Sequence, residues 1–201
     1  MVFVKVAAFL LLFVGLTAGV SAQITISGGF ALSQLDTSGS DLQGLDGGIG
    51  FGGNVYLDYL LPISVPLSLG VEVGVDTAKL DPDVNDSIVA IPLLARVAYH
   101  FDLLPKLDLY VVGKIGVVFG MWTGETKENL ENRGATIEIP PGVGFGIDGG
   151  AAYYFTAAIG AFVEAGFDRY GLSAKGKAAG QSDTLDAPFN RFLTFGISTK
   201  F

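Results

Sequence analysis

The stretch Leu193-Thr-Phe-Gly-Ile-Ser-Thr-Lys-Phe201 alternates between large apolar residues and small or polar ones. Its large apolar residues are Leu193, Phe195, Ile197 and Phe201, all at odd positions. Successive side chains of a β-strand point to opposite faces, so one face of this segment is apolar and the other is polar or small. The stretch therefore predicts a β-strand with one face against an apolar medium.

The opposite end of the chain has the features of an export signal. A short positive region ends at Lys5, residues 6–16 are apolar, and a small-residue stretch ends at Val20-Ser21-Ala22. This order is typical of a cleaved signal peptide, although residues 1–20 also allow the alternative of a membrane anchor. We expect a signal peptide over residues 1–22 and a single domain over residues 23–201.

Composition narrows the class of protein. The chain has no cysteine and one histidine, His100, so thiolate metal sites, disulfides and multi-histidine metal centres are excluded, and we expect no metal or other cofactor. A net charge of -8 argues against nucleic-acid binding. Half of the residues are apolar, yet no segment after residue 22 offers the roughly 20 apolar residues of a membrane helix. Only helices and closed barrels can span a bilayer, so a barrel is expected.

Alternation like that of residues 193–201 recurs along the chain and predicts eight strands. Arg191 is the one charge on the apolar face, and nearly every other ionisable strand residue falls on the opposite face. An apolar exterior with a polar interior is typical of an antiparallel, up-and-down transmembrane β-barrel. Pro92 cannot donate a ladder hydrogen bond, so a bulge or a broken bond is expected there. The predicted strands cover residues 23–32, 49–60, 67–77, 87–101, 107–121, 143–155, 158–168 and 189–201.

The connectors alternate in length. Short ones are expected at 61–66, 102–106 and about 156–157, and long polar ones at 33–48, 78–86, 122–142 and 169–188. Barrels of this class have short periplasmic turns and longer outer loops. This pattern predicts that both chain ends lie in the periplasm.

Aromatic residues gather near both ends of the predicted strands. Two interfacial belts are the interpretation we favour, with ordinary core packing as the alternative. The inner belt would hold Tyr59, Tyr99, Phe101, Tyr153, Phe155 and Phe201, and the outer belt Phe51, Phe119, Trp122, Phe167 and Phe189.

With this pattern, the chain resembles the small eight-stranded outer-membrane barrels of the OmpA-barrel, OmpX and OmpW type. The resemblance covers residues 23–201 and rests on strand pattern, loop alternation and Phe201. It implies an integral outer-membrane location, contact with outer-membrane lipid, and recognition of Leu193, Phe195, Ile197 and Phe201 by the barrel-assembly machinery. It also implies a possible extracellular partner through the loops. The chain ends at the barrel, so no peptidoglycan-binding domain is expected.

Five charged residues occupy inward, mid-strand positions: Glu72, Arg96, Lys114, Asp148 and Glu164. An eight-stranded barrel is just wide enough for side chains to fill, and unpaired charges there would be costly. We expect a salt-bridged plug. A gate that opens by exchange of ion partners and a catalytic carboxylate pair are alternatives, but the narrow interior offers little room for a substrate.

Three functional classes follow: a structural or interaction protein, a transport protein and a membrane enzyme. We favour the first, a structural or interaction protein with surface loops. We expect no catalytic residues and therefore no enzyme. The alternative is a narrow gated channel, or an OmpW-like transporter of small solutes, hydrophobic ones among them. Lumen polarity separates the two, because a funnel for hydrophobic ligands would need an apolar lumen near the outer rim.

Overall fold

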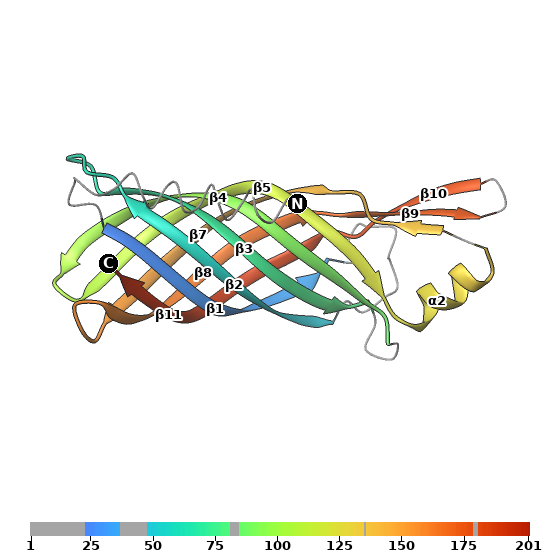
Figure 1. Ribbon diagram of the computed structural model, residues 1–201, viewed down its shortest axis with the longest axis horizontal. Coiled ribbons are helices and arrows are strands. Elements are labelled where there is room, and N and C mark those ends of the chain that lie inside the picture. The colour runs from blue at the N-terminus through green and yellow to red at the C-terminus, as the bar shows by residue number, and fades with distance from the viewer. Residues whose placement is uncertain (1–22, 37–47, 81–84, 135, 179–180) are drawn as a thin grey trace.

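A computed structural model describes residues 23–36, 48–80, 85–134, 136–178 and 181–201 of the protein. The expected signal peptide over residues 1–22 lies outside these ranges. The described chain forms a closed antiparallel barrel in the order β1-β11-β8-β7-β5-β4-β3-β2 (Figure 1). This confirms the eight-stranded fold. The barrel strands are β1 (Gln23–Leu35), β2 (Ile49–Leu60), β3 (Leu67–Lys79), β4 (Ser87–Leu104), β5 (Leu107–Thr123), β7 (Gly142–Tyr154), β8 (Ile159–Gly171) and β11 (Phe189–Lys200).

The first and last strands close the barrel. β1 pairs with β11 along most of its length, with Phe30 opposite Phe195 and Ile26 opposite Thr199. The short turns and both ends of the described chain lie at one end of the barrel, which we call the turn end (Figure 1). The opposite end, which carries the longer connections, is called the loop end.

The loop end contains structure that the strand pattern did not predict. Helix α2 (Glu125–Asn132) follows β5, and β6 (Thr136–Glu138), β9 (Ser173–Ala178) and β10 (Gln181–Asp186) form a small sheet in the order β10-β9-β6. This sheet continues beyond the barrel (Figure 1). Helix α2 begins after Gly124, whose φ is 138°, and Asp86 Oδ1 accepts a hydrogen bond from the Thr126 amide at 3.1 Å. No described helix is long and apolar enough to cross a bilayer.

The two faces of the barrel differ as predicted. On β3, Val71, Val73 and Val75 are exposed, whereas Glu72 and Asp76 are buried. Large apolar side chains also cover the outside of the other barrel strands, and β2, β4, β5, β7, β8 and β11 each bury at least one charged side chain inside. A soluble protein would reverse this arrangement, so the exterior is suited to hydrocarbon.

The prediction that Arg191 lies on the apolar outer face was wrong. The pairing of β11 shifts between Arg191 and Leu193 against both neighbouring strands. Against β1, Phe192 is an extra residue, because Arg191 and Leu193 pair with the consecutive residues Ser33 and Leu32. A bulge of this kind reverses the alternation. Phe189 and Arg191 consequently point inward and are buried, while Phe192 is exposed. The charge that seemed to lie on the lipid face is in the lumen.

Pro92 interrupts one ladder, in agreement with the prediction. The pairing of β3 with β4 runs to Val73–Leu93 and resumes at Asp76–Ala90. The offset between the strands is the same on both sides, so the ladder is broken without a bulge. On its other side Pro92 stays in register opposite Val118 of β5.

Candidate functional site

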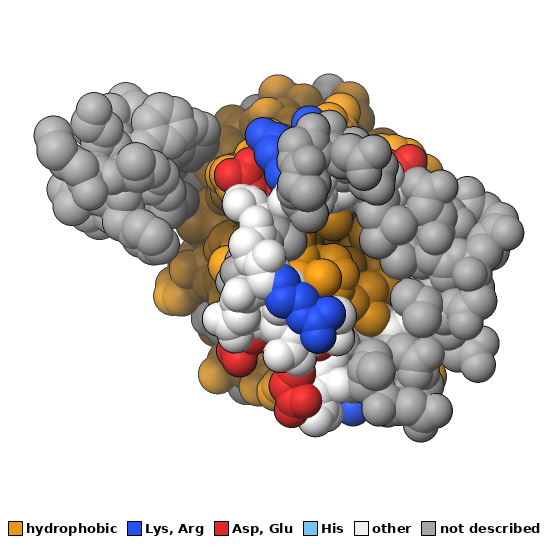
Figure 2. Space-filling model, turned by 90° about the vertical axis from the view of Figure 1, so that its right-hand side faces the viewer, with side chains coloured by type: hydrophobic (Ala, Val, Ile, Leu, Met, Phe, Trp, Pro, Cys, Tyr) orange, Lys and Arg blue, Asp and Glu red, His pale blue; other side chains and the backbone are white. Residues whose placement is uncertain are grey.

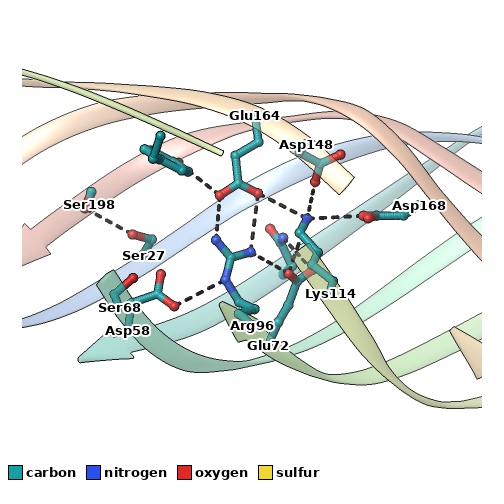
Figure 3. Close-up of polar contacts among 12 residues, drawn as sticks. Ser27, Asp58, Ser68, Glu72, Arg96, Lys114, Asp148, Glu164, Asp168 and Ser198 are labelled. Atoms are coloured by element: carbon teal, nitrogen blue, oxygen red, sulfur yellow. Dashed lines mark hydrogen bonds and ion pairs between the residues drawn. The ribbon is translucent and has the colours of Figure 1, made fainter. Parts of the chain in front are cut away.

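The centre of the barrel holds a layer of buried ion pairs built around three cations. Arg96 of β4 is one of them, and it is 1% exposed. Its Nη2 lies 2.6 Å from Glu164 Oε1 of β8, its Nη1 lies 2.7 Å from Glu72 Oε2 of β3, and its Nε lies 3.3 Å from Asp58 Oδ1 of β2. The guanidinium therefore joins carboxylates of strands from different sides of the barrel (Figure 3).

Lys114 of β5 is the second cation. Its Nζ is ion-paired with Asp148 of β7, and lies 3.2 Å from both Glu164 Oε2 and Asp168 Oδ2. Glu72 Oε2 is 3.6 Å away. The lysine and Arg96 thus share Glu72 and Glu164, which makes the ion pairs one network.

Arg191 of β11 is the third cation. Its Nη2 lies 2.5 Å from Glu72 Oε1 and 2.5 Å from Asp168 Oδ2. Asp76 Oδ2 is farther, at 4.0 Å from Nη1. The bulge in β11 is what places this guanidinium in the lumen.

The structure brings together all five charges that the sequence placed inside. It adds four members to this network, Asp58, Asp76, Asp168 and Arg191. Inward alternation could have identified Asp58, Asp76 and Asp168, whereas the bulge hid Arg191. The layer, called the charge layer below, holds three cations and six carboxylates: Arg96, Lys114, Arg191, Asp58, Glu72, Asp76, Asp148, Glu164 and Asp168.

Neutral side chains complete the charge layer. Tyr110 donates a hydrogen bond to Glu164 Oε1 at 2.9 Å, and Asn54 donates one to Glu72 Oε1 at 3.1 Å. The Arg96 guanidinium also lies over the Tyr56 ring, 3.8 Å from its centroid. Buried charges are tolerated only when they are paired and hydrogen-bonded, which most of these are.

Two less polar layers flank the charge layer. Toward the loop end, a cluster called the loop-end cluster consists of Leu35, Ala78, Leu80, Ile88, Ala90, Leu94, Val118, Tyr170, Leu172, Ala187 and Phe189. Figure 2 looks onto that end and shows hydrophobic side chains between the loop segments. Toward the turn end, Tyr56, Ala98, Tyr110, Val112, Ala152, Tyr154 and Phe162 form the turn-end cluster. The described residues include no group of three or more acidic or histidine side chains that could hold a metal ion.

The predicted aromatic belts differ between the two ends. At the turn end, Tyr99, Phe101, Tyr153, Phe155 and Phe201 are exposed on the outside, and Tyr59 is partly exposed. At the loop end, Phe51, Phe119 and Phe167 are exposed. The belt prediction was wrong for Trp122 and Phe189. Trp122 packs against the loop-end cluster, and Phe189 belongs to that cluster. Trp122 shares the inward alternation of Lys114 on β5.

The C-terminal residues of the expected assembly signal lie on the outer face of β11. Phe195, Ile197 and Phe201 are exposed, and Leu193 is partly exposed. Ser198, between them, is buried in the lumen. The alternation predicted for residues 193–201 is therefore present in the strand.

The closed eight-stranded antiparallel barrel is the fold of several solved outer-membrane proteins. Among solved structures, the chain is similar to Neisserial surface protein A, with a TM-score of 0.56 and 16% identity over 89% of this chain and 97% of that one. A major outer membrane protein from Thermus thermophilus has a TM-score of 0.55 and 15% identity, over 90% of this chain and 100% of that one. Outer membrane protein W of E. coli has a TM-score of 0.50 and 13% identity, over 91% of this chain and 100% of that one. No family model and no curated protein sequence matches. The likeness shows the fold.

Proposed function

We propose that this protein is an integral outer-membrane barrel with a closed lumen and a structural or interaction role exercised through its loops. Both termini would lie in the periplasm and the loop end would face outward. The observation that carries the proposal is the charge layer, in which side chains of β2, β3, β4, β5, β7, β8 and β11 meet across the lumen. A lumen filled by such a network would be closed to a continuous path of water.

Planar-bilayer recording of the refolded protein tests the closed lumen. We expect no discrete openings. Discrete openings would contradict a closed lumen and favour the gated channel. An excess of carboxylates over cations in the charge layer means that such a channel would prefer cations, which the reversal potential in a salt gradient would reveal.

The membrane-spanning face can be tested by charge insertion. Val71 is exposed on the outside of β3 next to the charge layer, so Val71→Lys should cost about 2–4 kcal/mol of unfolding free energy. Val65 is also exposed, but in the turn between β2 and β3. Val65→Lys is the matched control and should change little. Urea titration in lipid vesicles measures both, and equal costs would contradict a lipid-facing β3.

Recognition by the assembly machinery would depend on the exposed terminal ring. Phe201→Ala removes it from the end of β11, and we expect a lower level of folded protein in the outer membrane. Exposed Phe155, at the end of β7, offers Phe155→Ala as a control for the loss of an aromatic ring. Normal levels of the Phe201 variant would count against the assembly signal.

The loop end would supply the contact surface for an extracellular partner. Lys175 and Lys177 are exposed on β9, the central strand of the small sheet. Blue side chains are visible on this face in Figure 2. Such a surface would favour an anionic partner. Lys175→Glu with Lys177→Glu should abolish binding to such a partner and leave barrel stability unchanged.

A second function, passage of small hydrophobic solutes, is favoured by the loop-end cluster. It supplies an apolar lumen near the expected outer rim. The chain has a single tryptophan, Trp122, which packs against this cluster. A brominated alkane that enters the lumen would therefore quench its fluorescence strongly. In the control, Trp122→Phe with Phe119→Trp moves the indole to the outer face, and equal quenching in both would indicate partition into lipid only.

A further inference from the structure

Three polar side chains at the turn end form a hydrogen-bonded chain. Ser68 of β3, His100 of β4 and Asp108 of β5 come from three neighbouring strands. Ser68 Oγ lies 2.9 Å from His100 Nε2, and His100 Nδ1 lies 2.9 Å from Asp108 Oδ1. A hydroxyl, an imidazole and a carboxylate in this order are the parts of an activated serine nucleophile.

The direction of the hydrogen bonds follows from the acceptor at one end. A carboxylate can only accept, so His100 Nδ1–H donates to Asp108. Nε2 of the neutral ring then carries a lone pair, and it accepts the hydrogen bond from the Ser68 hydroxyl. The second carboxylate oxygen, Asp108 Oδ2, lies 3.5 Å from Lys200 Nζ. The imidazole is therefore oriented as a base toward Ser68.

The strands hold the three residues in fixed register. Ser68 is paired with Ala98, two residues before His100, and His100 is paired with Tyr110, two residues after Asp108. Inward positions on adjacent strands thereby form a row across β3, β4 and β5. A site built on paired strands keeps its geometry better than one built on loops.

The row lines a cavity at the turn end of the lumen. The cavity has a volume of about 80 Å³, and Ser68, His100 and Asp108 are all in its wall. Apolar groups of Leu60, Ala98 and Phe162 line it as well. An apolar cavity of about 150 Å³ holds benzene. The smaller cavity here, of about 80 Å³, suits an acyl group of a few carbons. The side chains of His100 and Asp108 are 17% and 16% exposed, so the row reaches solvent.

We propose that Ser68, His100 and Asp108 form a serine-hydrolase site for small carboxylic esters with a short acyl group. Ser68 Oγ attacks the ester carbonyl carbon while its proton passes to His100 Nε2. The carbon–oxygen bond to the alcohol then breaks, and the alcohol leaves with the proton from His100. Water, deprotonated by His100, attacks the acyl-serine, and release of the carboxylic acid restores the Ser68 hydroxyl.

The wall of the described cavity holds one cation, Lys200, and two acids, Asp58 and Asp108. Lys200 Nζ lies 3.9 Å from the centroid of the Tyr154 ring and 3.5 Å from Asp108 Oδ2. Asp108 is a positioning residue, because it acts on the ester only through His100.

Labelling with a fluorophosphonate tests the nucleophile. The folded, reconstituted protein is treated with the probe, and the modified peptide is identified by mass spectrometry. We expect modification at Ser68, lost in Ser68→Ala and reduced at least about 100-fold in rate in His100→Asn. Ser33 is also buried in the lumen, toward the loop end, so Ser33→Ala is the control and should label as the parent protein does.

Hydrolysis of p-nitrophenyl acetate gives the second readout. Asp108→Asn should lower kcat much more than it changes KM, since Asp108 acts on the reacting carbon only through His100. Each variant is first shown to be folded by its mobility shift on an unheated gel. A folded parent protein that takes no label, or labelling that is equally fast in His100→Asn, would overturn the proposal.

Discussion

The two ends of the barrel interior treat their polar groups differently. On the turn side of the lumen, Tyr110 is bonded to Glu164, and Ser27 Oγ donates to Ser198 Oγ at 3.0 Å. On the loop side, the Tyr170 hydroxyl faces the Asp76 carboxylate without a hydrogen bond of ordinary geometry, and Ser33 Oγ is also buried without a partner in the described structure. Among the described residues, the turn-end cluster has one such atom, the Tyr56 hydroxyl oxygen, and Asn54 Oδ1 in the charge layer is another, so the two sides differ in degree.

This difference follows from what surrounds each polar group. Near the loop end, Tyr170 stacks on Phe189, with ring centroids 6.0 Å apart and an interplanar angle of 12°, and both rings pack among the apolar side chains of the loop-end cluster. An unsatisfied buried polar group costs free energy, which apolar packing there must offset. We infer that packing stabilises the loop side, whereas hydrogen bonds and ion pairs stabilise the turn side and the charge layer.

Removal of Arg96 should have the largest effect. Arg96→Ala leaves Glu72, Glu164 and Asp58 without their shared partner, so the unfolding free energy should fall by at least about 3–5 kcal/mol. Urea titration in lipid vesicles measures the loss. The control is Arg169→Ala, since Arg169 makes a partly exposed ion pair with Asp36 at 3.0 Å. That change should cost less than about 1 kcal/mol, and similar losses would mean that the charge layer stabilises little.

Truncation of Phe189 tests the packing on the loop side. Phe189→Ala removes a fully buried ring from the loop-end cluster and should cost about 3 kcal/mol. Phe192 of the same strand points outward, so Phe192→Ala is the matched control and should cost less. Urea midpoints in lipid vesicles compare the two. An equal loss in both variants would remove the distinction between a packed loop side and a lipid-facing exterior.

The barrel was predictable because its signal is repeated. A period of two residues, as in Val71, Val73 and Val75 against Glu72 and Asp76, is set by strand geometry and needs no knowledge of partners. The predicted strands therefore agree with the observed ones to within a few residues at most ends. The charges inside followed from the same alternation.

Other features depend on contacts that alternation does not encode. The sequence pattern misplaced Arg191 because β11 has one extra residue relative to β1, which reverses the alternation along the strand. β9 has the sequence Ser-Ala-Lys-Gly-Lys-Ala, which carries little apolar alternation, and it pairs with β6 from a distant loop. The row of Ser68, His100 and Asp108 needed the register of three strands, so its members appeared in the sequence as unrelated inward residues.

Two tyrosine hydroxyls give the smallest and sharpest test of the difference between the two sides. Tyr110→Phe removes the hydroxyl that donates to Glu164, and since Arg96 and Lys114 still bind that carboxylate, the expected loss is about 1 kcal/mol. Tyr170→Phe removes a buried hydroxyl that makes no hydrogen bond of ordinary geometry within the described residues, so the unfolding free energy should stay constant or rise slightly. Both changes delete one oxygen and keep the ring, so urea midpoints in the same vesicles compare them directly. Equal losses would mean that the Tyr170 hydroxyl does bond, with Asp76 as the acceptor it faces, and the polar groups of the two sides would then be equally satisfied.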